Sequence, residues 1–238
     1  MEAVTYQYIK VSKSDFRMDV TLARPEKRNA FTPTMVNEIA HAFTAANEDD
    51  SIKVVVIKAE GPVFCAGMDL KTFENPDLDV RNPQIQNKEI SLGEVFDSLC
   101  KPAVAIVEGD VIAGAFLIIL GCTYVYCRRE VRFRLPELDL GIFPFQVMAS
   151  LLKVMPEKKV LQLCLETDYF SASKAKELGI VDGYLEEINL EEQLQSFEKM
   201  NVKALSAGIQ ALHAVQDVSK SDRFSFLMKA LDNLKKDQ

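Results

Sequence analysis

Two short turns of small residues each follow an apolar run and lead into a segment with a helical pattern. The first turn reads CAGM (residues 65–68) and follows residues 54–57; the second reads AGA (residues 113–115) and follows residues 103–107. A helix start leaves backbone N–H groups without intrahelical partners, and small residues let another group approach them closely. Two such N–H groups that converge on one point form an oxyanion hole, which stabilises negative charge on a carbonyl oxygen. Close packing of helices explains the same residues, and spacing alone favours that simpler interpretation.

Other chemistry has less support in the sequence. His41 and His213 lie on expected helices far from both turns and have no recognisable Ser or Cys partner, so we do not expect a hydrolytic triad. The five cysteines form no CxxC pair, which argues against a disulfide framework or a zinc site, and no metal is expected. Cys65 is expected to be a small buried thiol. Asp69, just after the first turn, is expected to cap a helix.

The elements that must position these turns alternate between strand and helix, which predicts an α/β core. Residues 4–11 and 16–23 have the pattern of a hairpin, and a helix is expected from Pro33 to about residue 48 with Thr32 as its cap. Further strands are expected at 53–58, 103–107, 123–127 and 131–133. Further helices are expected at 89–99, 114–120, 145–154, 157–165, 171–178, 190–214 and 222–235. The polar segment 74–87 is expected to be a mobile loop.

Composition limits the class of protein. The 238 residues carry a formal net charge of -7, which argues against a nucleic-acid partner but allows a small anionic ligand. Residues 1–10 show no signal-peptide pattern, and no apolar run is long enough to cross a bilayer. We therefore expect a soluble, cytoplasmic protein with no membrane partner. A core domain is expected over residues 1–187 and a helical C-terminal region over 188–238.

Five motifs, in this order, resemble the signatures of the crotonase superfamily, also called the enoyl-CoA hydratase/isomerase family. They are RPEKRNAF (24–31), VVVIKAEGPVFCAGMDLK (54–71), KPAVAIVEGDVIAGA (101–115), FRLPELDLGIFP (133–144) and SASKAKELGIVD (171–182). The resemblance covers about residues 4–187 and implies a crotonase (ClpP-like) α/β fold, a spiral of ββα repeats followed by a helical trimerisation region. It implies an acyl-CoA enzyme of fatty-acid metabolism that forms homotrimers or dimers of trimers. No cofactor is implied beyond the coenzyme A of the substrate thioester.

The resemblance also assigns roles to residues. The oxyanion donors are the N–H groups of Met68 and Gly114, although relatives usually have three glycines at positions 113–115, and Glu137 is the catalytic carboxylate. The residues implied for binding substrate and CoA are Lys27, Arg28, Cys65, Ala66, Met68, Asp69, Leu70, Lys71, Gly114, Leu117, Pro136 and Phe143. Asp110 and Asp139 are further polar candidates near the acyl pocket. Thr123 stands where many relatives have Asp.

Leu117 departs from the pattern of the family's hydratases, which have a glutamate there and a second one matching Glu137. Leucine cannot position a water molecule, whereas one carboxylate in apolar surroundings, with a raised pKa, can move a proton between two carbons. The resemblance therefore favours isomerisation of 3-enoyl-CoA to 2-enoyl-CoA. The alternatives are a hydratase or decarboxylase (a lyase) on the same scaffold, a carrier-protein thioester in place of CoA, and a non-catalytic acyl-CoA-binding subunit. Without the resemblance, Glu137 reads as a surface carboxylate paired with Arg132 or Arg134.

Overall fold

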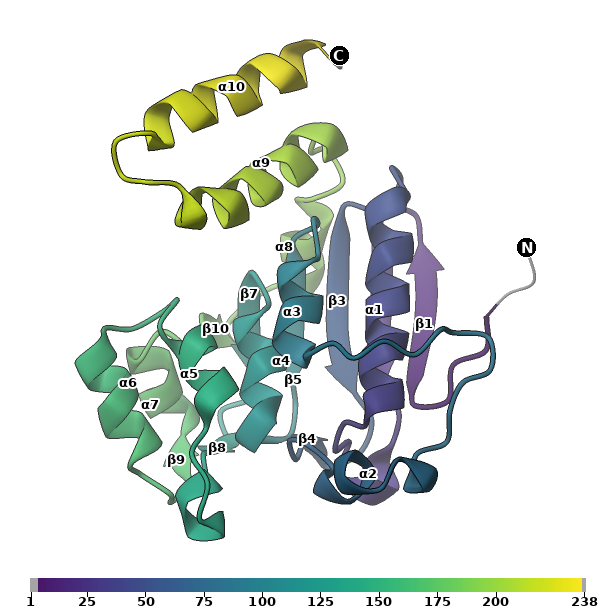
Figure 1. Cartoon of the computed structure of the whole chain (residues 1–238), viewed down its shortest axis with the longest axis vertical. Helices are drawn as coiled ribbons and strands as arrows, with labels where there is room; N and C mark the ends of the chain where they lie inside the picture. Colours follow the sequence, from purple (N-terminus) through teal and green to yellow (C-terminus); the bar gives the residue numbers. More distant parts are fainter. Residues whose placement is uncertain (1–3, 237–238) are drawn as a thin grey trace.

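A six-stranded sheet forms the centre of the computed structural model, which describes residues 4–236 (Figure 1). Its order is β1-β2-β3-β5-β7-β10; β1 and β2 pair antiparallel, and each later neighbour pairs in parallel. The strands are β1 (Ile9–Ser14), β2 (Arg17–Leu22), β3 (Val54–Ala59), β5 (Ala103–Val107), β7 (Tyr124–Cys127) and β10 (Gly183–Tyr184). β3 and β5 are apolar and largely buried, as expected for parallel strands covered on both faces.

A smaller sheet of four strands has the order β4-β6-β8-β9. Its strands are β4 (Val63–Cys65), β6 (Asp110–Ile112), β8 (Arg132–Arg134) and β9 (Phe170–Ser171). β4, β6 and β8 follow β3, β5 and β7 in the chain, and the helices that come next are α2 (Leu70–Glu74), α4 (Phe116–Leu120) and α5 (Phe145–Leu151). The chain thus repeats a ββα unit three times, as the resemblance implies. The sequence pattern missed β4 and β6, because a strand of three residues is too short for alternation to be recognised.

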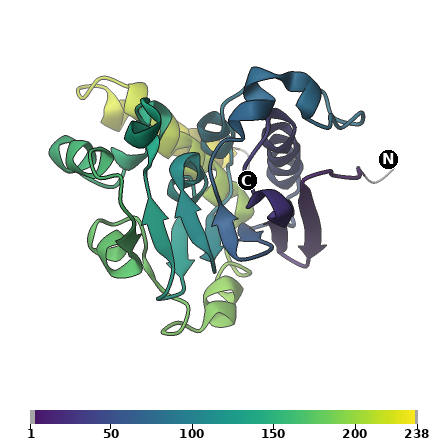
Figure 2. The same ribbon diagram turned by 90° about the horizontal axis from the view of Figure 1, so that it is seen from below.

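Helix α1 (Pro33–Glu48) lies against β1 and β2 (Figures 1 and 2). Thr32 caps it as predicted, because the Thr32 hydroxyl accepts a hydrogen bond of 3.1 Å from the Met35 N–H. The other helices of the core are α3 (Leu92–Asp97), α6 (Glu157–Cys164), α7 (Ala172–Glu177) and α8 (Leu190–Gln195). Helix α8 covers the second face of the main sheet, where Leu194 packs with Val54 and Val56 of β3.

The C-terminal helices project from the core (Figure 1). The expected helix over 190–214 is two helices, α8 and α9 (Val202–Ala214), because residues 196–201 interrupt it and Asn201 caps the second. Helix α9 packs against α10 (Arg223–Lys236), and neither helix has a fully buried residue. None of the helices within residues 4–236 combines the length and apolarity needed to span a membrane.

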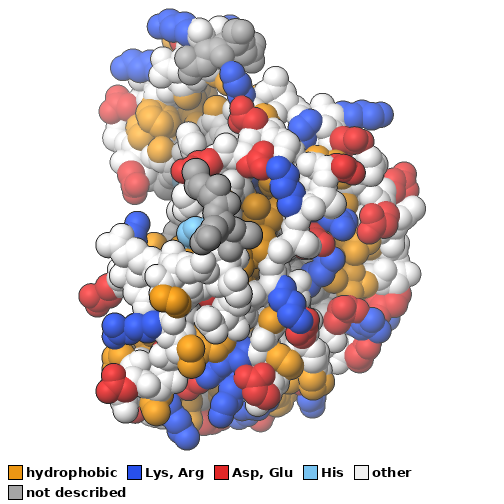
Figure 3. Space-filling model, turned by 90° about the vertical axis from the view of Figure 1, so that its right-hand side faces the viewer, with side chains coloured by type: hydrophobic (Ala, Val, Ile, Leu, Met, Phe, Trp, Pro, Cys, Tyr) orange, Lys and Arg blue, Asp and Glu red, His pale blue; other side chains and the backbone are white. Residues whose placement is uncertain are grey.

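Acidic and basic side chains are interspersed over the face that carries α1 and β1 (Figure 3). That face shows no broad basic field of the kind that gathers nucleic-acid phosphates, which agrees with the negative net charge.

The segment after α2 crosses α1 as an extended connection (Figure 1). The fully buried Glu38 carboxylate of α1 holds it there by accepting a hydrogen bond of 2.7 Å from the Asn82 side chain. Glu38 also accepts bonds of 2.6 and 2.9 Å from the backbone N–H groups of Gln7 and Tyr8. The expected loop is therefore tied to α1 and to the start of the chain; its mobility stays a prediction.

Replacing Glu38 with alanine should lower the free energy of unfolding by about 2 kcal/mol or more, because the buried Asn82 side chain and the partly buried N–H groups of Gln7 and Tyr8 lose their acceptor, and one buried unsatisfied donor costs roughly 1–3 kcal/mol. Chemical denaturation of the wild type and Glu38→Ala measures the loss. Glu48→Ala, at an exposed position of the same helix, is the control and should change the free energy by less than about 0.5 kcal/mol. An equal effect of the two substitutions would show that the Glu38 hydrogen bonds contribute nothing specific.

Candidate active site

The two glycine-containing turns lie against each other because the strands that precede them, β4 and β6, are parallel neighbours in the small sheet. Gly67 has a φ of +86°, and a Cβ built on it would lie 2.8 Å from the Ala113 Cβ and 3.1 Å from the Gly114 nitrogen. Real Cβ atoms do not approach another carbon so closely, so the first turn requires glycine here. Ala113 itself has a φ of +54°, in the left-handed region that glycine adopts at lower cost.

The Met68 N–H has no hydrogen-bond partner within residues 4–236, and its direction is fixed by its neighbour. The Gly67 carbonyl, in the same peptide plane, accepts a bond of 2.8 Å from the Phe31 N–H. The peptide bonds of the described chain are trans, so the C=O and N–H of a plane point in opposite directions. The Met68 N–H therefore points away from the Phe31 N–H.

Gly114 supplies the second N–H. It is the second residue of a 3-10 turn (Ala113–Ala115), a position whose N–H finds no acceptor inside the turn. A Cβ built on Gly114 would lie 3.7 Å from the Met68 nitrogen. The structure thus brings together the two backbone groups that the sequence singled out.

Glu137 begins the turn after β8 and is 7% exposed. Its Oε2 atom is buried and has no hydrogen-bond partner among the described residues. Arg132 pairs with Asp110 at 2.7 Å and Arg134 with Asp139 at 2.8 Å, so neither arginine forms the expected alternative ion pair with Glu137. Burial disfavours the charged form and raises the pKa of the Glu137 carboxyl above its ordinary value.

A cavity of about 580 Å³ joins Glu137 to the two turns. Five residues that the resemblance implies for substrate binding also line it: Met68, Gly114, Leu117, Pro136 and Phe143. Its other apolar walls include Phe31, Ile112 and Val147. Asp139 lines it as well, whereas Asp110 does not; Asp139 is already paired with Arg134. Within the described chain, Glu137 is therefore the carboxylate of this cavity that has no cationic partner.

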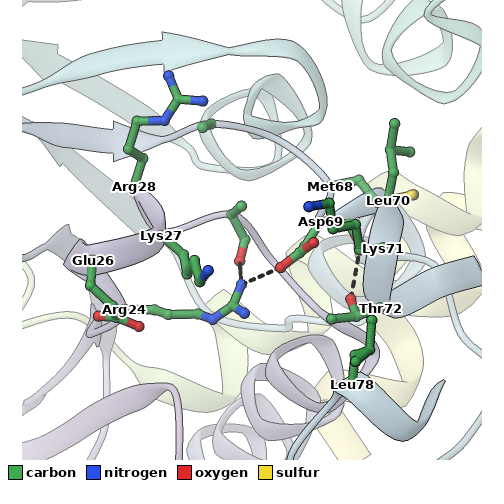
Figure 4. A pocket seen from close by; sticks show the side chains of 12 residues that line it. Arg24, Glu26, Lys27, Arg28, Met68, Asp69, Leu70, Lys71, Thr72 and Leu78 are labelled. Atoms are coloured by element: carbon green, nitrogen blue, oxygen red, sulfur yellow. Dashed lines mark hydrogen bonds and ion pairs between the residues drawn. The ribbon is translucent and has the colours of Figure 1, made fainter. Parts of the chain in front are cut away.

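A second cavity of about 740 Å³ adjoins the first (Figure 4). Lys27, Arg28, Asp69, Leu70 and Lys71 line it, and Arg28, Ala66, Met68 and Leu70 line both cavities. Lys27, Arg28 and Lys71 are exposed, and no ion pair holds them within residues 4–236. Their charges suit an anionic ligand such as a phosphate, beside a site that suits a carbonyl group.

Every predicted binding residue lines one cavity or the other except Cys65. Cys65 is fully buried, as expected of a small core thiol, and burial raises its pKa to about 12. Thr123 has a structural part: its hydroxyl accepts a bond of 3.1 Å from the Ala103 N–H and so links the starts of β5 and β7.

Asp69 corrects one prediction. It occupies the cap position of α2, but its side chain accepts no cap hydrogen bond. Its carboxylate instead pairs at 2.8 Å with Arg24, which is 7% exposed. Our sequence reasoning missed Arg24; the only signal was its place in the motif that also holds Lys27 and Arg28.

The catalytic candidates share one structural origin. Met68 lies three residues after β4, Gly114 two residues after β6, and Glu137 three residues after β8. All three groups are thus carried just past the ends of adjacent parallel strands of the small sheet.

Comparisons with known proteins concern the sequence and the fold of the chain. The model of the family described as "Enoyl-CoA hydratase/isomerase" matches residues 17–233. Hydroxycinnamoyl-CoA hydratase-lyase of Pseudomonas fluorescens is 26% identical over 95% of this chain and 86% of its own length. 2,3-dehydroadipyl-CoA hydratase of Escherichia coli (strain K12) is 29% identical over 88% of this chain and 83% of its own length. The crystal structure of an enoyl-CoA hydratase/isomerase from Marinobacter aquaeolei superimposes with a TM-score of 0.81 at 22% identity, covering 96% of this chain and 90% of that one.

Replacing Ala113 with glycine should raise the free energy of unfolding by about 1 kcal/mol, because it removes a side chain from a left-handed conformation. Denaturant titration measures the change. Ala115→Gly is the control: it alters a neighbouring residue without a positive φ and should destabilise the protein. Stabilisation by both substitutions, or by neither, would show that the conformation of Ala113 is not strained.

Proposed function

The chain belongs to the enoyl-CoA hydratase/isomerase family, and within that family we propose that it isomerises 3-enoyl-CoA thioesters to 2-enoyl-CoA. The family match confirms the resemblance, and the structural likeness confirms the crotonase fold. One observation carries the finer proposal. Glu137, buried and unpaired, shares its cavity with Leu117, the residue that stands where the hydratase pattern has its other carboxylate.

In the proposed reaction, the thioester oxygen accepts hydrogen bonds from the N–H groups of Met68 and Gly114. Glu137 removes a proton from C2, the carbon next to the thioester carbonyl. The C2–H electron pair moves into the π system, and the resulting dienolate places its charge on the oxygen held by the two N–H groups. Glu137 then returns the proton to C4, so the double bond shifts from C3–C4 to C2–C3 and no atom is gained or lost.

The apolar walls have two consequences for this reaction. Leu117, Phe143 and Val147 themselves carry no carboxylate or other polar group that would hold a water molecule against the double bond. They also desolvate Glu137, and the raised pKa makes it a stronger base toward a weakly acidic carbon.

The adjoining cavity supports CoA as the carrier. Lys27, Arg28 and Lys71 would meet the phosphates while the acyl group extends past Glu137. A trimer or a dimer of trimers remains part of the proposal. It is supported by the apolar side chains that α10 exposes, among them Phe224 at 85% and Met228 at 66%.

Hydration is the second candidate. The names of the two sequence relatives describe hydratases, and Asp139 places a second carboxylate on the wall of the same cavity. Its ion pair with Arg134 argues against a part in proton transfer. The products distinguish the two reactions.

Incubation of the purified protein with 3-hexenoyl-CoA should yield 2-hexenoyl-CoA, detected by chromatography. Glu137→Gln should lower the rate at least about 10²-fold, since it removes the base and keeps the shape. Asp139→Asn is the matched control and should retain most of the rate. Conversion of 2-hexenoyl-CoA to 3-hydroxyhexanoyl-CoA, in a reaction lost in Asp139→Asn, would favour the hydratase, and full activity of Glu137→Gln would refute the assigned base.

The rate of isomerisation should rise with pH through the raised pKa of Glu137, because only the ionised carboxylate accepts the proton. The acid limb of kcat should therefore lie above the ordinary glutamate value of 4.5. Measuring kcat against pH with saturating 3-hexenoyl-CoA tests this. An acid limb at or below 4.5 would contradict a desolvated base.

A further inference from the structure

We infer that the partly buried ion pair between Arg24 and Asp69 positions the Met68 N–H, so that Arg24 and Asp69 assist catalysis without touching the substrate. The inference rests on the proposed function, because it gives that N–H the thioester oxygen as its acceptor.

The pair joins two segments that are far apart in the sequence (Figure 4). Arg24 Nη1 donates to Asp69 Oδ2 at 2.8 Å and to the Ala30 carbonyl at 2.9 Å. The Arg24 and Asp69 side chains are 9% and 17% exposed, so solvent screens their attraction far less than that of a surface pair. Asp69 directly follows Met68, and Ala30 directly precedes Phe31. The guanidinium therefore bridges the two segments beside the donor.

Backbone hydrogen bonds connect the same two segments on either side of Met68. The Phe31 N–H donates to the Gly67 carbonyl at 2.8 Å, and the Asp69 N–H donates to the Phe31 carbonyl at 2.9 Å. These bonds fix the peptide planes before and after Met68. Because Arg24 ties the Asp69 side chain to Ala30, it resists a separation of the two segments that would break these bonds and tilt the Met68 N–H.

Arg24 is itself held in place, so it can serve as a fixed reference. Its backbone N–H donates to the Asn29 side chain at 2.9 Å. The fully buried Asn29 donates in turn to the carbonyls of Glu60 and Val63, at 2.8 and 2.9 Å. The loop of residues 24–31 is thereby anchored to the segment that runs from the end of β3 to the start of β4. The first turn follows the end of β4.

A direct part in binding phosphate fits Arg24 poorly. It lines the larger cavity, yet Asp69 already neutralises its charge and its side chain is almost covered. Lys27, Arg28 and Lys71 line the same cavity and are exposed. These three residues are the better ligands for phosphate. We therefore assign Arg24 the structural role of holding Asp69.

Acetoacetyl-CoA provides a probe that is independent of Glu137, because its enolate absorbs in the near ultraviolet and forms by loss of an acidic proton. The wild type and Glu137→Gln should both promote the enolate when they bind it. Asp69→Ala should raise the apparent pKa of bound acetoacetyl-CoA by about one unit or more and lower kcat for 3-hexenoyl-CoA about tenfold or more. This effect is smaller than the loss of a whole oxyanion donor, which lowers kcat roughly 10²–10³-fold, because the donor is displaced and not removed. The affinity for CoA alone should change less than about threefold.

Asp69→Asn retains an oxygen that can accept from Arg24 and should rescue most of kcat. Asp19→Ala is the matched control: Asp19 is 15% exposed, pairs with Lys58 at 3.1 Å and lines neither cavity. It should leave kcat and the enolate signal unchanged. If Asp69→Ala does not fold, Arg24→Lys decides, because it keeps the charge but lacks the Nη1 atom that makes both hydrogen bonds, and it should lower kcat about tenfold.

The outcomes separate this inference from the proposed function. Suppose that the wild type promotes the enolate and that Asp69→Ala, or Arg24→Lys in its place, does so equally well. This result would overturn the inference but would leave the proposed oxyanion hole intact. A loss of CoA affinity in the tested variant, with kcat unchanged, would also overturn the inference and would assign Arg24 a role in binding phosphate. A wild type that does not promote the enolate would refute the oxyanion hole and this inference together.

Discussion

The contact between the two turns is the constraint on which the rest of the site depends. Two backbone N–H groups can serve one oxygen only if their turns approach more closely than side chains normally allow. At Gly67 this excludes any Cβ, and at residue 113 it forces an alanine into a left-handed conformation. The strand pairing that precedes the turns, and the hydrogen bonds through Phe31, hold the backbone in this arrangement.

Glu137 imposes a different demand. A buried carboxylate without a cationic partner is destabilising when ionised, since burial removes the solvation that its charge would have in water. The arginines nearby pair with Asp110 and Asp139 instead. The fold thus pairs both arginines with aspartates and leaves Glu137, the proposed base, without a cationic partner, which favours a raised pKa.

Much of this arrangement could be predicted from the sequence, and the limits are physical. The Thr32 cap, strand β5 and the residues of both turns follow from local patterns and from motifs that a single segment carries. The partner of Asp69 does not, because it lies 45 residues away and local chemistry favours a helix cap equally well. Strands β4 and β6 were not predicted for a similar reason. A segment of three residues becomes a strand because it pairs with its neighbour, and its own sequence is too short to show a strand pattern.

The small sheet, whose strand ends carry Met68, Gly114 and Glu137, has a consequence for how such an enzyme diversifies. Each ββα unit contributes one group, and the units share a common frame of parallel strands. The leucine at position 117 belongs to one of these units, and the strand pairing that places Met68 and Glu137 does not involve its side chain. Under the proposed function, one such scaffold can keep the backbone groups that hold an enolate and exchange the side chains that move protons.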